Sequence, residues 1–295
     1  MKILVFGSLN IDRRYTVDHF VMPGETLNSL ALGTFSGGKG LNQAIACKKA
    51  GSDVYMAGKI GADGAFLLAE LKDADVSTKH VFIDEGMMSG HAIIQVDKNG
   101  QNCILLYGGS NRAITKEFVD SVLDHFEAGD ILLLQNEISE LDYIIDKAYE
   151  KGMQIFLNPS PYDGHLDACD MGKISCFLLN EIEGGQISGG ETEPDKIIES
   201  ILGKYENAKI VLTLGGDGSI YADRNECYHQ EIFKVDAVDT TAAGDTFTGY
   251  FIAGILNGTP IKEILRMSAV AAGIAVSRPG ASPSIPFMDE VKKML

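Results

Sequence analysis

The alternation of short apolar runs with longer helical patterns is the feature that most constrains the fold of this chain. The apolar runs are as short as strands covered on both faces of a sheet should be. They lie at 3–6, 54–57, 131–134, 155–157, 176–179 and 210–214. Apolar residues at helical spacing occupy 40–50, 65–74, 116–126, 140–151, 195–205, 244–257 and 261–276. This order predicts an α/β fold with a doubly wound, mostly parallel sheet flanked by helices, and ligands at the carboxyl ends of its strands.

Two segments interrupt the alternation, at roughly 13–35 and 91–107. Both show period-two patterning and turn residues, and the Asn99-Gly100 pair between two apolar runs is a strong hairpin signal. We expect the two segments to form a small β-sheet lid over one end of the main sheet. The alternative is that they extend the main sheet. No linker or repeat divides the chain, so residues 1–295 are expected to form a single domain.

Composition disfavours several classes of protein. The formal net charge of −16 disfavours nucleic acid and an anionic membrane as partners. No apolar run approaches the ~18 residues of a membrane helix. The five cysteines include no C-x-x-C pair, so neither a disulfide framework nor a structural zinc is expected, and a cytoplasmic location fits best.

The stretch 236–249 carries the first candidate site. Its pattern predicts a strand end near 235–238, then a run of small residues, then a helix that begins at or near Gly244. The small residues Ala242, Ala243 and Gly244 leave the first amides of that helix open to an anion. Asp245 would then stand beside the anion, where a carboxylate suits a base that takes a proton from a nucleophile. The alternative is that Asp245 is only an acidic residue in a first helical turn.

Polar residues also follow other expected strands at their carboxyl ends. Asn10 and Asp12 follow the first strand and lie on the same side of an extended chain, so both can bond neighbouring hydroxyl groups. Glu137 follows the run at 131–134. Each has a plain alternative as strand-end capping, but their convergence on one edge of the sheet favours a ligand site.

A glycine-rich turn precedes the first helix. Gly33 to Lys39 match the beginning of a P-loop, but Gly40 stands where the magnesium-binding Ser or Thr is needed, so we reject a P-loop. The turn still offers bare amides at Gly38, the ammonium of Lys39 and the amide of Asn42 to a polyhydroxylated ligand.

Three further segments lie on the same expected edge. Asn180 and Glu183 are neighbours on one helical face, and such a pair can hold a hydrated magnesium ion through water. Thr213 is followed by glycines, which suits a nucleotide that passes close to the backbone. The glycine-rich piece 184–190 is expected to be only a loop, and 275–284 is by itself a plain turn after the last long helix.

With these residues the chain resembles the ribokinase (PfkB-type) family of ATP-dependent sugar and nucleoside kinases over essentially its whole length. Both family signatures are present, at 37–44 (Gly-Gly-Lys-Gly-Leu-Asn-Gln-Ala) and at 239–247 (Asp-Thr-Thr-Ala-Ala-Gly-Asp-Thr-Phe). The order of Gly-Ser-x-Asn-x-Asp, Pro-Gly-Glu-Thr and Leu-Asn-Pro-Ser-Pro around them is that of the ribokinase branch of the family.

The resemblance implies a role for each matching position. Asp245 would be the catalytic base, with Ala242, Ala243 and Gly244 as its anion hole. The sugar would be bound by Asn10, Asp12, Gly38, Lys39, Asn42 and Glu137, together with Asp245. ATP would be bound by Asn180, Thr213, Gly215, Gly216 and Gly218, with Glu183 organising Mg²⁺ indirectly. An activating K⁺ would be held at Asp239, Thr241, Ala275, Arg278, Gly280 and Ser284.

The implied reaction is transfer of the γ-phosphoryl group of ATP to the primary 5-hydroxyl of a pentose, first of all D-ribose. A homodimer formed through the lid is also implied. The alternatives are a kinase for another small sugar or a nucleoside, and a sugar or nucleotide sensor on the same fold. The chain departs from the family pattern near the sugar and nucleotide edges, at Leu41, Asn136, Arg13-Arg14 and Gly184-Gly185.

Overall fold

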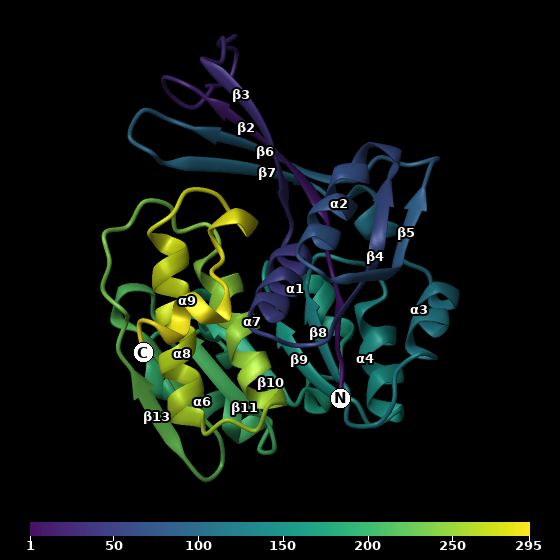
Figure 1. The fold of residues 1–295 in the computed structure, drawn as a ribbon, viewed down its shortest axis with the longest axis vertical. Coiled ribbons are helices and arrows are strands. Elements are labelled where there is room, and N and C mark those ends of the chain that lie inside the picture. The colour runs from purple at the N-terminus through teal and green to yellow at the C-terminus, as the bar shows by residue number, and fades with distance from the viewer.

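The computed structural model describes residues 1–295 and contains two sheets. The larger one has nine strands in the order β13-β12-β11-β10-β9-β8-β1-β4-β5, with helices on both faces (Figure 1). Its strands are β1 (Ile3–Phe6), β4 (Val54–Gly61), β5 (Ser77–Asp84), β8 (Ile131–Gln135), β9 (Gln154–Asn158), β10 (Cys176–Asn180), β11 (Lys209–Thr213), β12 (Ser219–Ala222) and β13 (Cys227–Gln230). The helices are α1 (Lys39–Lys49), α2 (Ala65–Asp73), α3 (Lys116–Leu123), α4 (Leu141–Glu150), α5 (Glu181–Ser188), α6 (Pro194–Lys204), α7 (Ala243–Leu256), α8 (Ile261–Val276) and α9 (Met288–Lys292).

The predicted parallel sheet is confirmed over most of its width. Strand β1 pairs in parallel with β4 on one side and with β8 on the other, and the parallel pairing continues to β5 and to β11. Only β12 and β13, at one edge, run antiparallel to their neighbours. The carboxyl ends of β1, β8, β9, β10 and β11 therefore lie along one edge of the sheet, where the sequence predicts the ligands.

Both faces of this sheet are buried, which explains why its strands are continuous apolar runs. Leu4 and Phe6 of β1 belong to a core that also contains residues of α3, α4, α5 and α6. Ile3 and Val5 point to the other face and join a core with residues of α1, α2, α7 and α8. Because successive side chains of a strand point to opposite faces, one four-residue strand anchors both layers of helices.

A separate sheet of four strands projects from the body (Figure 1), so the two interrupting segments do not extend the main sheet. We call it the lid sheet; its order is β3-β2-β6-β7, with β2 (Asn10–Thr16), β3 (Ala31–Gly37), β6 (Gly90–Val96) and β7 (Asn102–Tyr107). The hairpin predicted at Asn99-Gly100 is confirmed, because β6 and β7 pair antiparallel on either side of it. Strand β3 leads into α1 through the single residue Gly38.

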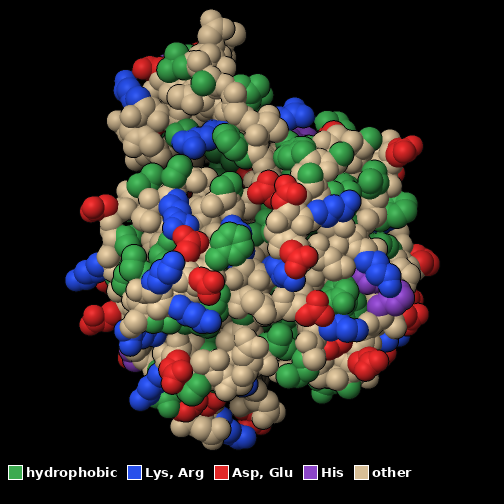
Figure 2. Space-filling view, in the orientation of Figure 1, with side chains coloured by type: hydrophobic (Ala, Val, Ile, Leu, Met, Phe, Trp, Pro, Cys, Tyr) green, Lys and Arg blue, Asp and Glu red, His purple; other side chains and the backbone are tan.

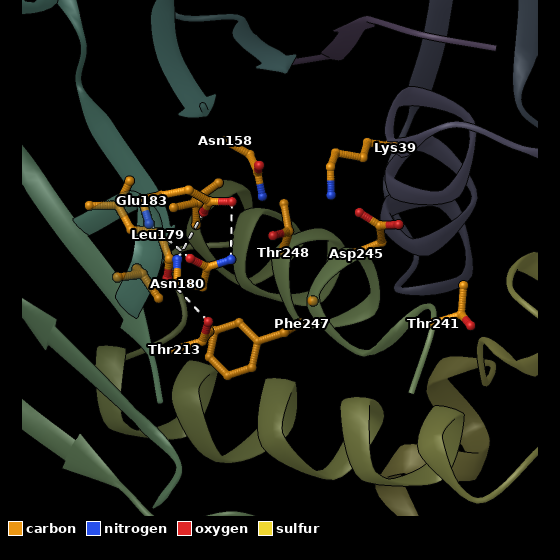
Figure 3. Close-up of a pocket in the computed structure, with 13 residues that line it drawn as sticks. Lys39, Asn158, Leu179, Asn180, Glu183, Thr213, Thr241, Asp245, Phe247 and Thr248 are labelled. Atoms are coloured by element: carbon orange, nitrogen blue, oxygen red, sulfur yellow. Dashed lines mark hydrogen bonds between the residues drawn. The ribbon is translucent and has the colours of Figure 1, made fainter. Parts of the chain in front are cut away.

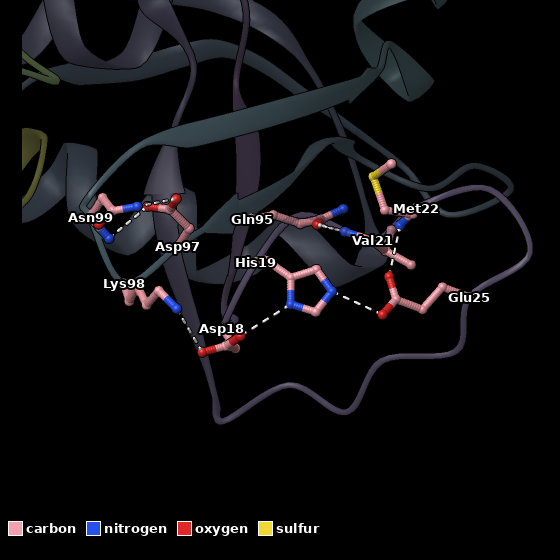
Figure 4. Close-up of polar contacts among 9 residues, drawn as sticks. All are labelled: Asp18, His19, Val21, Met22, Glu25, Gln95, Asp97, Lys98 and Asn99. Atoms are coloured by element: carbon pink, nitrogen blue, oxygen red, sulfur yellow. Dashed lines mark hydrogen bonds and ion pairs between the residues drawn. The ribbon is translucent and has the colours of Figure 1, made fainter.

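The far end of the lid sheet is tied together by polar contacts (Figure 4). The ring of His19 lies between the carboxylates of Asp18, 3.1 Å from Nδ1, and Glu25, 2.8 Å from Nε2. The ammonium of Lys98, in the β6–β7 turn, lies 3.4 Å from Asp18. The loop between β2 and β3 is thus bonded to itself and to the neighbouring hairpin.

Two local predictions are wrong, and strands β5, β12 and β13 of the main sheet were not predicted. The piece 184–190 was expected to be a loop, but α5 continues through Gly184 and Gly185 to Ser188, because the Asn180 and Glu183 side chains cap its first turn. The strand end expected at 235–238 is irregular chain. The antiparallel strands β12 and β13 had no counterpart in the sequence pattern. No helix in the structure combines the length and the apolar character needed to cross a membrane.

Candidate active site

Asp245 lies in the first turn of α7 and is enclosed by the first turns of α1. It is only 7% exposed. Asn42 Nδ2 donates a hydrogen bond to Asp245 Oδ2 at 2.9 Å, and Gln43 Nε2 donates to Asp245 Oδ1 at 2.9 Å. The glycine-rich turn and the stretch 236–249, about 200 residues apart in sequence, thus meet at one carboxylate.

The amino end of α7 leaves backbone donors open. The amides of Ala242, Gly244 and Asp245 donate to no acceptor in the protein, whereas the amide of Ala243 donates to the Thr240 carbonyl at 3.2 Å. A Cβ added to Gly244 would meet no atom within 4 Å, and Gly244 lines two cavities, so open space adjoins this helix start. Open amides at a helix amino end can bind an anion.

Burial and charge have opposite effects on Asp245. Burial raises the pKa of its carboxyl group, while the charge of Lys39 and the hydrogen bonds from Asn42 and Gln43 lower it, and the net shift is upward. For Lys39, burial alone would lower the pKa, but the charges of Asp245, Glu137 and Glu183 raise it. The site therefore contains an ammonium in the field of several carboxylates.

The residues predicted for the sugar meet where the lid sheet joins the body. Glu137, just past β8, accepts a hydrogen bond from the hydroxyl of Ser8 and a longer one of 3.4 Å from the amide of Lys39. Asn10 Oδ1 accepts a hydrogen bond of 2.7 Å from Asn111 Nδ2. The buried Oδ1 of Asn42 has no hydrogen-bond partner in the protein, so it is an acceptor left for a ligand.

Asp12 lies at the base of the lid sheet, against Gly37 of the neighbouring strand β3. Burial, and then the charge of Glu137, raise the pKa of Asp12 from 3.8 to about 7. Burial also raises the pKa of Glu137, against the opposing charge of Lys39 and the hydrogen bond from Ser8. The charge of Glu137 thus disfavours ionisation of Asp12, the charge of Asp245 disfavours ionisation of Glu137, and donors on a bound molecule would relieve both effects.

A small cavity of about 130 Å³ lies beside Asp245 and opens between α7 and the ends of β9, β10 and β11. Figure 3 shows Lys39 and Asp245 on one side of it and the group of Asn180, Glu183 and Thr213 on the other, with Thr248 between them. The ammonium of Lys39 points into the space between Asn158, at the end of β9, Thr248 and Asp245. Cationic and amide groups therefore line the space between the two halves of the site.

A larger cavity of about 650 Å³ adjoins the small one, and Asn180, Thr213, Gly244 and Phe247 line both. It contains every residue predicted for the nucleotide, namely Asn180, Thr213, Gly215, Gly216 and Gly218. Its other walls are largely apolar, with side chains such as Ile232, Phe233, Val235, Ala272 and Val276. An apolar cleft with a polar end is typical of a site for a flat, partly polar ligand.

Glu183 is engaged by Asn180 in a capping box. Asn180 N and Nδ2 each donate to a different carboxylate oxygen of Glu183 at 3.0 Å, and Glu183 N donates back to Asn180 Oδ1 at 3.0 Å. The structure contains no cluster of three or more His, Cys, Asp or Glu side chains that would hold a metal ion by themselves. Glu183 and Asp245 are the two buried carboxylates that line the small cavity.

The residues predicted for a monovalent cation come from two adjacent loops. Asp239 Oδ2 accepts a hydrogen bond of 3.1 Å from the Gly280 amide, while its Oδ1 accepts from the amide and hydroxyl of Thr241. Ser284 donates to the Ala281 carbonyl at 2.8 Å, and Arg278 pairs through its side chain with Glu290. The carbonyl of Ala275, in the last turn of α8, accepts from the Arg278 amide. Contacts thus connect Asp239 with Gly280, and Ala275 with Arg278.

Several residues in contact with the site were not singled out from the sequence. Gln43 bonds Asp245, Ser8 bonds Glu137, and Asn111 bonds Asn10. Asn158 and Thr248 line the small cavity. Gln43 and Asn158 lie within stretches that carry the family resemblance, so that signal was available. Asn111 lies in an isolated helical turn with no pattern to mark it.

Known proteins are similar to this chain over nearly its whole length. The family model described as pfkB family carbohydrate kinase matches residues 1–288. A ribokinase of Staphylococcus aureus is 32% identical over 302 residues, which cover 99% of each chain. A deoxyribokinase of Salmonella typhimurium is 29% identical over 303 residues, covering 100% of this chain and 99% of that protein.

Solved structures are similar at the level of the whole fold. The structure of Arabidopsis thaliana ribokinase complexed with ribose and ATP superposes with a TM-score of 0.87 and 29% identity. The match covers 99% of this chain and 98% of that one. A likeness of this extent includes both the main sheet and the lid sheet.

Proposed function

Because the chain belongs to the PfkB family of carbohydrate kinases, and is thus a phosphotransferase acting on an alcohol group, we propose that its acceptor is D-ribose. The reaction transfers the γ-phosphoryl group of ATP to the primary 5-hydroxyl and yields D-ribose 5-phosphate and ADP. The relatives named ribokinase, at about a third identity over nearly the full length of both chains, support this acceptor.

The single observation that carries the proposal is the position of Asp245 between two differently built compartments. On one side are Asn42, Lys39 and Glu137, whose polar groups suit the hydroxyls of a small sugar. On the other is the cavity of about 650 Å³ with mostly apolar walls, which suits the adenine and ribose of ATP. The γ-phosphoryl group would lie at the junction, in front of the free amides of α7.

In this arrangement each group has a defined part in the reaction. Asp245 receives the proton of the primary hydroxyl as the new oxygen–phosphorus bond forms and the bond from phosphorus to the β–γ bridging oxygen breaks. The amides of Gly244 and Asp245 donate to the oxygens of the transferring group, and the ammonium of Lys39 offsets their charge. Of the three residues predicted for the anion hole, Ala243 has its amide occupied by Thr240.

Deoxyribose is the acceptor that most needs to be distinguished from ribose, because a deoxyribokinase is nearly as similar to this chain. The sugar side is rich in acceptors: Asn10, Asp12 and the unpartnered Oδ1 of Asn42. A site built to bond a hydroxyl discriminates against the analogue that lacks it, since a buried polar group is then left unpaired. This abundance of acceptors favours ribose. A nucleoside would need stacking for its base, and the chain has no tryptophan.

We further propose that Mg²⁺ accompanies ATP in the small cavity. The carboxylate of Glu183, with the amide of Asn180 beside it and no cluster of three or more metal-ligating side chains nearby, fits a magnesium ion that is held mainly by the phosphates and reaches the protein through water. The ion would neutralise charge on the β- and γ-phosphates. The role of the protein here is to orient Glu183, and the capping box with Asn180 does so.

An activating K⁺ is proposed at the two loops around Asp239. The carboxylate of Asp239 supplies the negative charge, and Thr241, Ala275, Arg278, Gly280 and Ser284 supply carbonyl or hydroxyl oxygens close by. The loop of Asp239 and Thr241 directly precedes the open amides of α7, so a cation here would order the anion hole.

A homodimer through the lid sheet is the proposed assembly. All six residues of β7 are exposed, and apolar side chains such as Ile104, Leu105 and Leu106 face outward at this edge strand. Figure 2 shows apolar side chains along the projecting sheet. An edge strand with exposed apolar residues favours association. All five cysteines are free, which fits the proposed location in the reducing cytoplasm.

The test of the acceptor is an assay of ADP release with ATP and Mg²⁺ against ribose, deoxyribose, fructose, ribitol and several nucleosides, with K⁺ and with Na⁺ in its place. We expect the highest kcat/KM for ribose and a higher rate in K⁺, with phosphorus NMR identifying the 5-phosphate. If a nucleoside is phosphorylated and ribose gives no ADP, ribose is not the acceptor. No ADP from any acceptor would favour the sensor.

A further inference from the structure

Two buried glutamine side chains stand behind the carboxylate of Asp245 and have no part in the mechanism above. Gln43 lies in the second turn of α1 and Gln135 is the last residue of β8, and both are fully buried. Gln43 Nε2 donates to Asp245 Oδ1 at 2.9 Å, and Gln135 Nε2 donates to Gln43 Oε1 at 2.7 Å. The three side chains form one continuous hydrogen-bonded chain from the sheet to the carboxylate.

The direction of these hydrogen bonds is determined by Asp245. An ionised carboxylate can only accept, so the amide nitrogen of Gln43 must face it. The amide oxygen of Gln43 must then face away, toward Gln135, which in turn must donate. Gln135 Oε1, at the far end, has no partner in the protein and packs beside Gly7. Both amides are thus held in one orientation, and each donates toward Asp245.

We propose that Gln43 is a positioning residue for the catalytic carboxylate, and that Gln135 orients Gln43 for this role. The inference rests on the proposed function, in which Asp245 accepts the proton. Gln43 holds Oδ1, while Oδ2 accepts a hydrogen bond from Asn42 Nδ2 and keeps a second lone pair for the sugar hydroxyl. The proton of the hydroxyl then passes to Oδ2 as the oxygen–phosphorus bond forms, and leaves to solvent after ADP and the sugar phosphate depart.

Three observations support a fixed carboxylate. Both amides come from regular elements of the core, α1 and β8, so their positions are defined by backbone that does not depend on ligand. Neither glutamine lines the cavities on either side of Asp245. The hydrogen bond from Gln43 also lowers the pKa of Asp245 against the larger effect of burial, and so favours the ionised form of the base.

The experiment compares Gln43→Met, Gln135→Met and the double variant with the wild type. Methionine removes the amide at nearly constant length and volume. Gln154→Met, which changes a half-buried glutamine at the amino end of β9, is the matched control. For each protein we would measure kcat, the KM values for ribose and ATP, the pH dependence of kcat, and thermal unfolding.

The expected result has three parts. Gln43→Met lowers kcat about 100-fold, the size typical of a misplaced reacting group, with both KM values within a few-fold of wild type. The acid limb of its kcat profile moves to higher pH, because an ionised Asp245 has lost a hydrogen bond. Gln135→Met shows a smaller loss of the same kind, and the double variant resembles Gln43→Met because the two residues act in one chain.

Other outcomes would overturn the inference. If the wild type is active and Gln43→Met has the same kcat, the inference is wrong while the proposed function stands. The same holds if Gln43→Met loses activity but the acid limb of its kcat profile does not move. A wild type that phosphorylates no acceptor contradicts the proposed function and the inference together. If Gln43→Met does not fold, Gln135→Met decides: an unchanged kcat and acid limb in that variant contradict the inference. The Gln154→Met control should match the wild type throughout.

Discussion

At the scale of the residue, the substitution Asp245→Asn addresses the chemistry most directly. An amide has nearly the shape of the carboxylate but cannot take up the hydroxyl proton. We expect ATP and sugar to bind within a few-fold of wild type while turnover falls by at least ~10²–10⁴. Isothermal titration of each ligand, beside the ADP-release assay, separates the two effects. Near-normal phosphorylation by this variant would remove Asp245 from the mechanism.

Asp12 makes a second prediction, on the pH dependence of stability. Its pKa is about 7 in the fold against an ordinary value of 3.8, so between these values the folded protein holds a proton that the unfolded chain has lost. The wild type should therefore lose stability from this group as the pH rises from about 4 to about 7. Asp12→Asn, which does not titrate, should gain in unfolding temperature relative to wild type over that window. Thermal unfolding of the ligand-free proteins at pH 4 to 8 measures this, and a constant difference would contradict it.

The sequence reveals a site residue when that residue belongs to a local backbone pattern. Asp245 and Asn42 were found because a helix start and a glycine-rich turn are local patterns, and the structure brings them within 2.9 Å. Gln43 and Asn111 were not found, because a buried amide looks like any polar residue until its partner is known. Those partners lie 202 and 101 positions away in the sequence.

At the scale of the element, the close packing of α1 against α7 holds the site together. A Cβ on Gly249 of α7 would lie 2.3 Å from Ala46 Cβ and 2.6 Å from the Cys47 amide. Gly249→Ala should therefore destabilise the protein by about 1–3 kcal/mol, even though alanine favours a helix. It should also lower kcat, because moving α7 from α1 separates Asp245 from Asn42 and Gln43.

Urea unfolding and the ADP-release assay measure both effects. Gly203→Ala is the matched control, since Gly203 lies in α6 and an added Cβ would meet no atom within 4 Å. That variant should be as stable as wild type or gain up to about 1 kcal/mol. Equal stability of the two glycine variants would contradict the close-packing argument.

The elements that the sequence predicted well are those with a clear hydrophobic pattern. Strand β1 and helix α8 have the expected bounds, because a continuous apolar run and a long amphipathic pattern are each unambiguous. Helix α5 was expected only at its first turn, around Asn180 and Glu183, because the two glycines that follow disfavour a helix, and the capping box that offsets them depends on side-chain geometry. Strands β12 and β13 were missed because short antiparallel edge strands carry only a weak pattern.

At the scale of the whole molecule, the exposed apolar residues of β7 predict association. We expect a dimer for the wild type and a monomer for the variant that carries both Ile104→Lys and Leu105→Lys, because two adjacent charges reach both faces of the edge strand. Size-exclusion chromatography with light scattering gives the mass. Tyr149→Lys adds a charge at an exposed aromatic residue of α4 and should leave the dimer intact. A wild type that runs as a monomer at micromolar concentration would contradict the proposed assembly.

Because only Gly38 separates β3 from α1, with φ of 93° and a Cβ position 2.9 Å from the Asn10 amide and the Ser8 carbonyl, the lid sheet and the site helix meet at a nearly rigid corner. The loop between β2 and β3 is the far end of that arm, and Gly24 at its tip has no neighbour within 4 Å of a Cβ. A ligand-binding domain inserted at Gly24 would transmit its change of shape through the lid sheet to α1, the helix that carries Lys39, Asn42 and Gln43. Ligand binding to the inserted domain would thus change the rate of sugar phosphorylation.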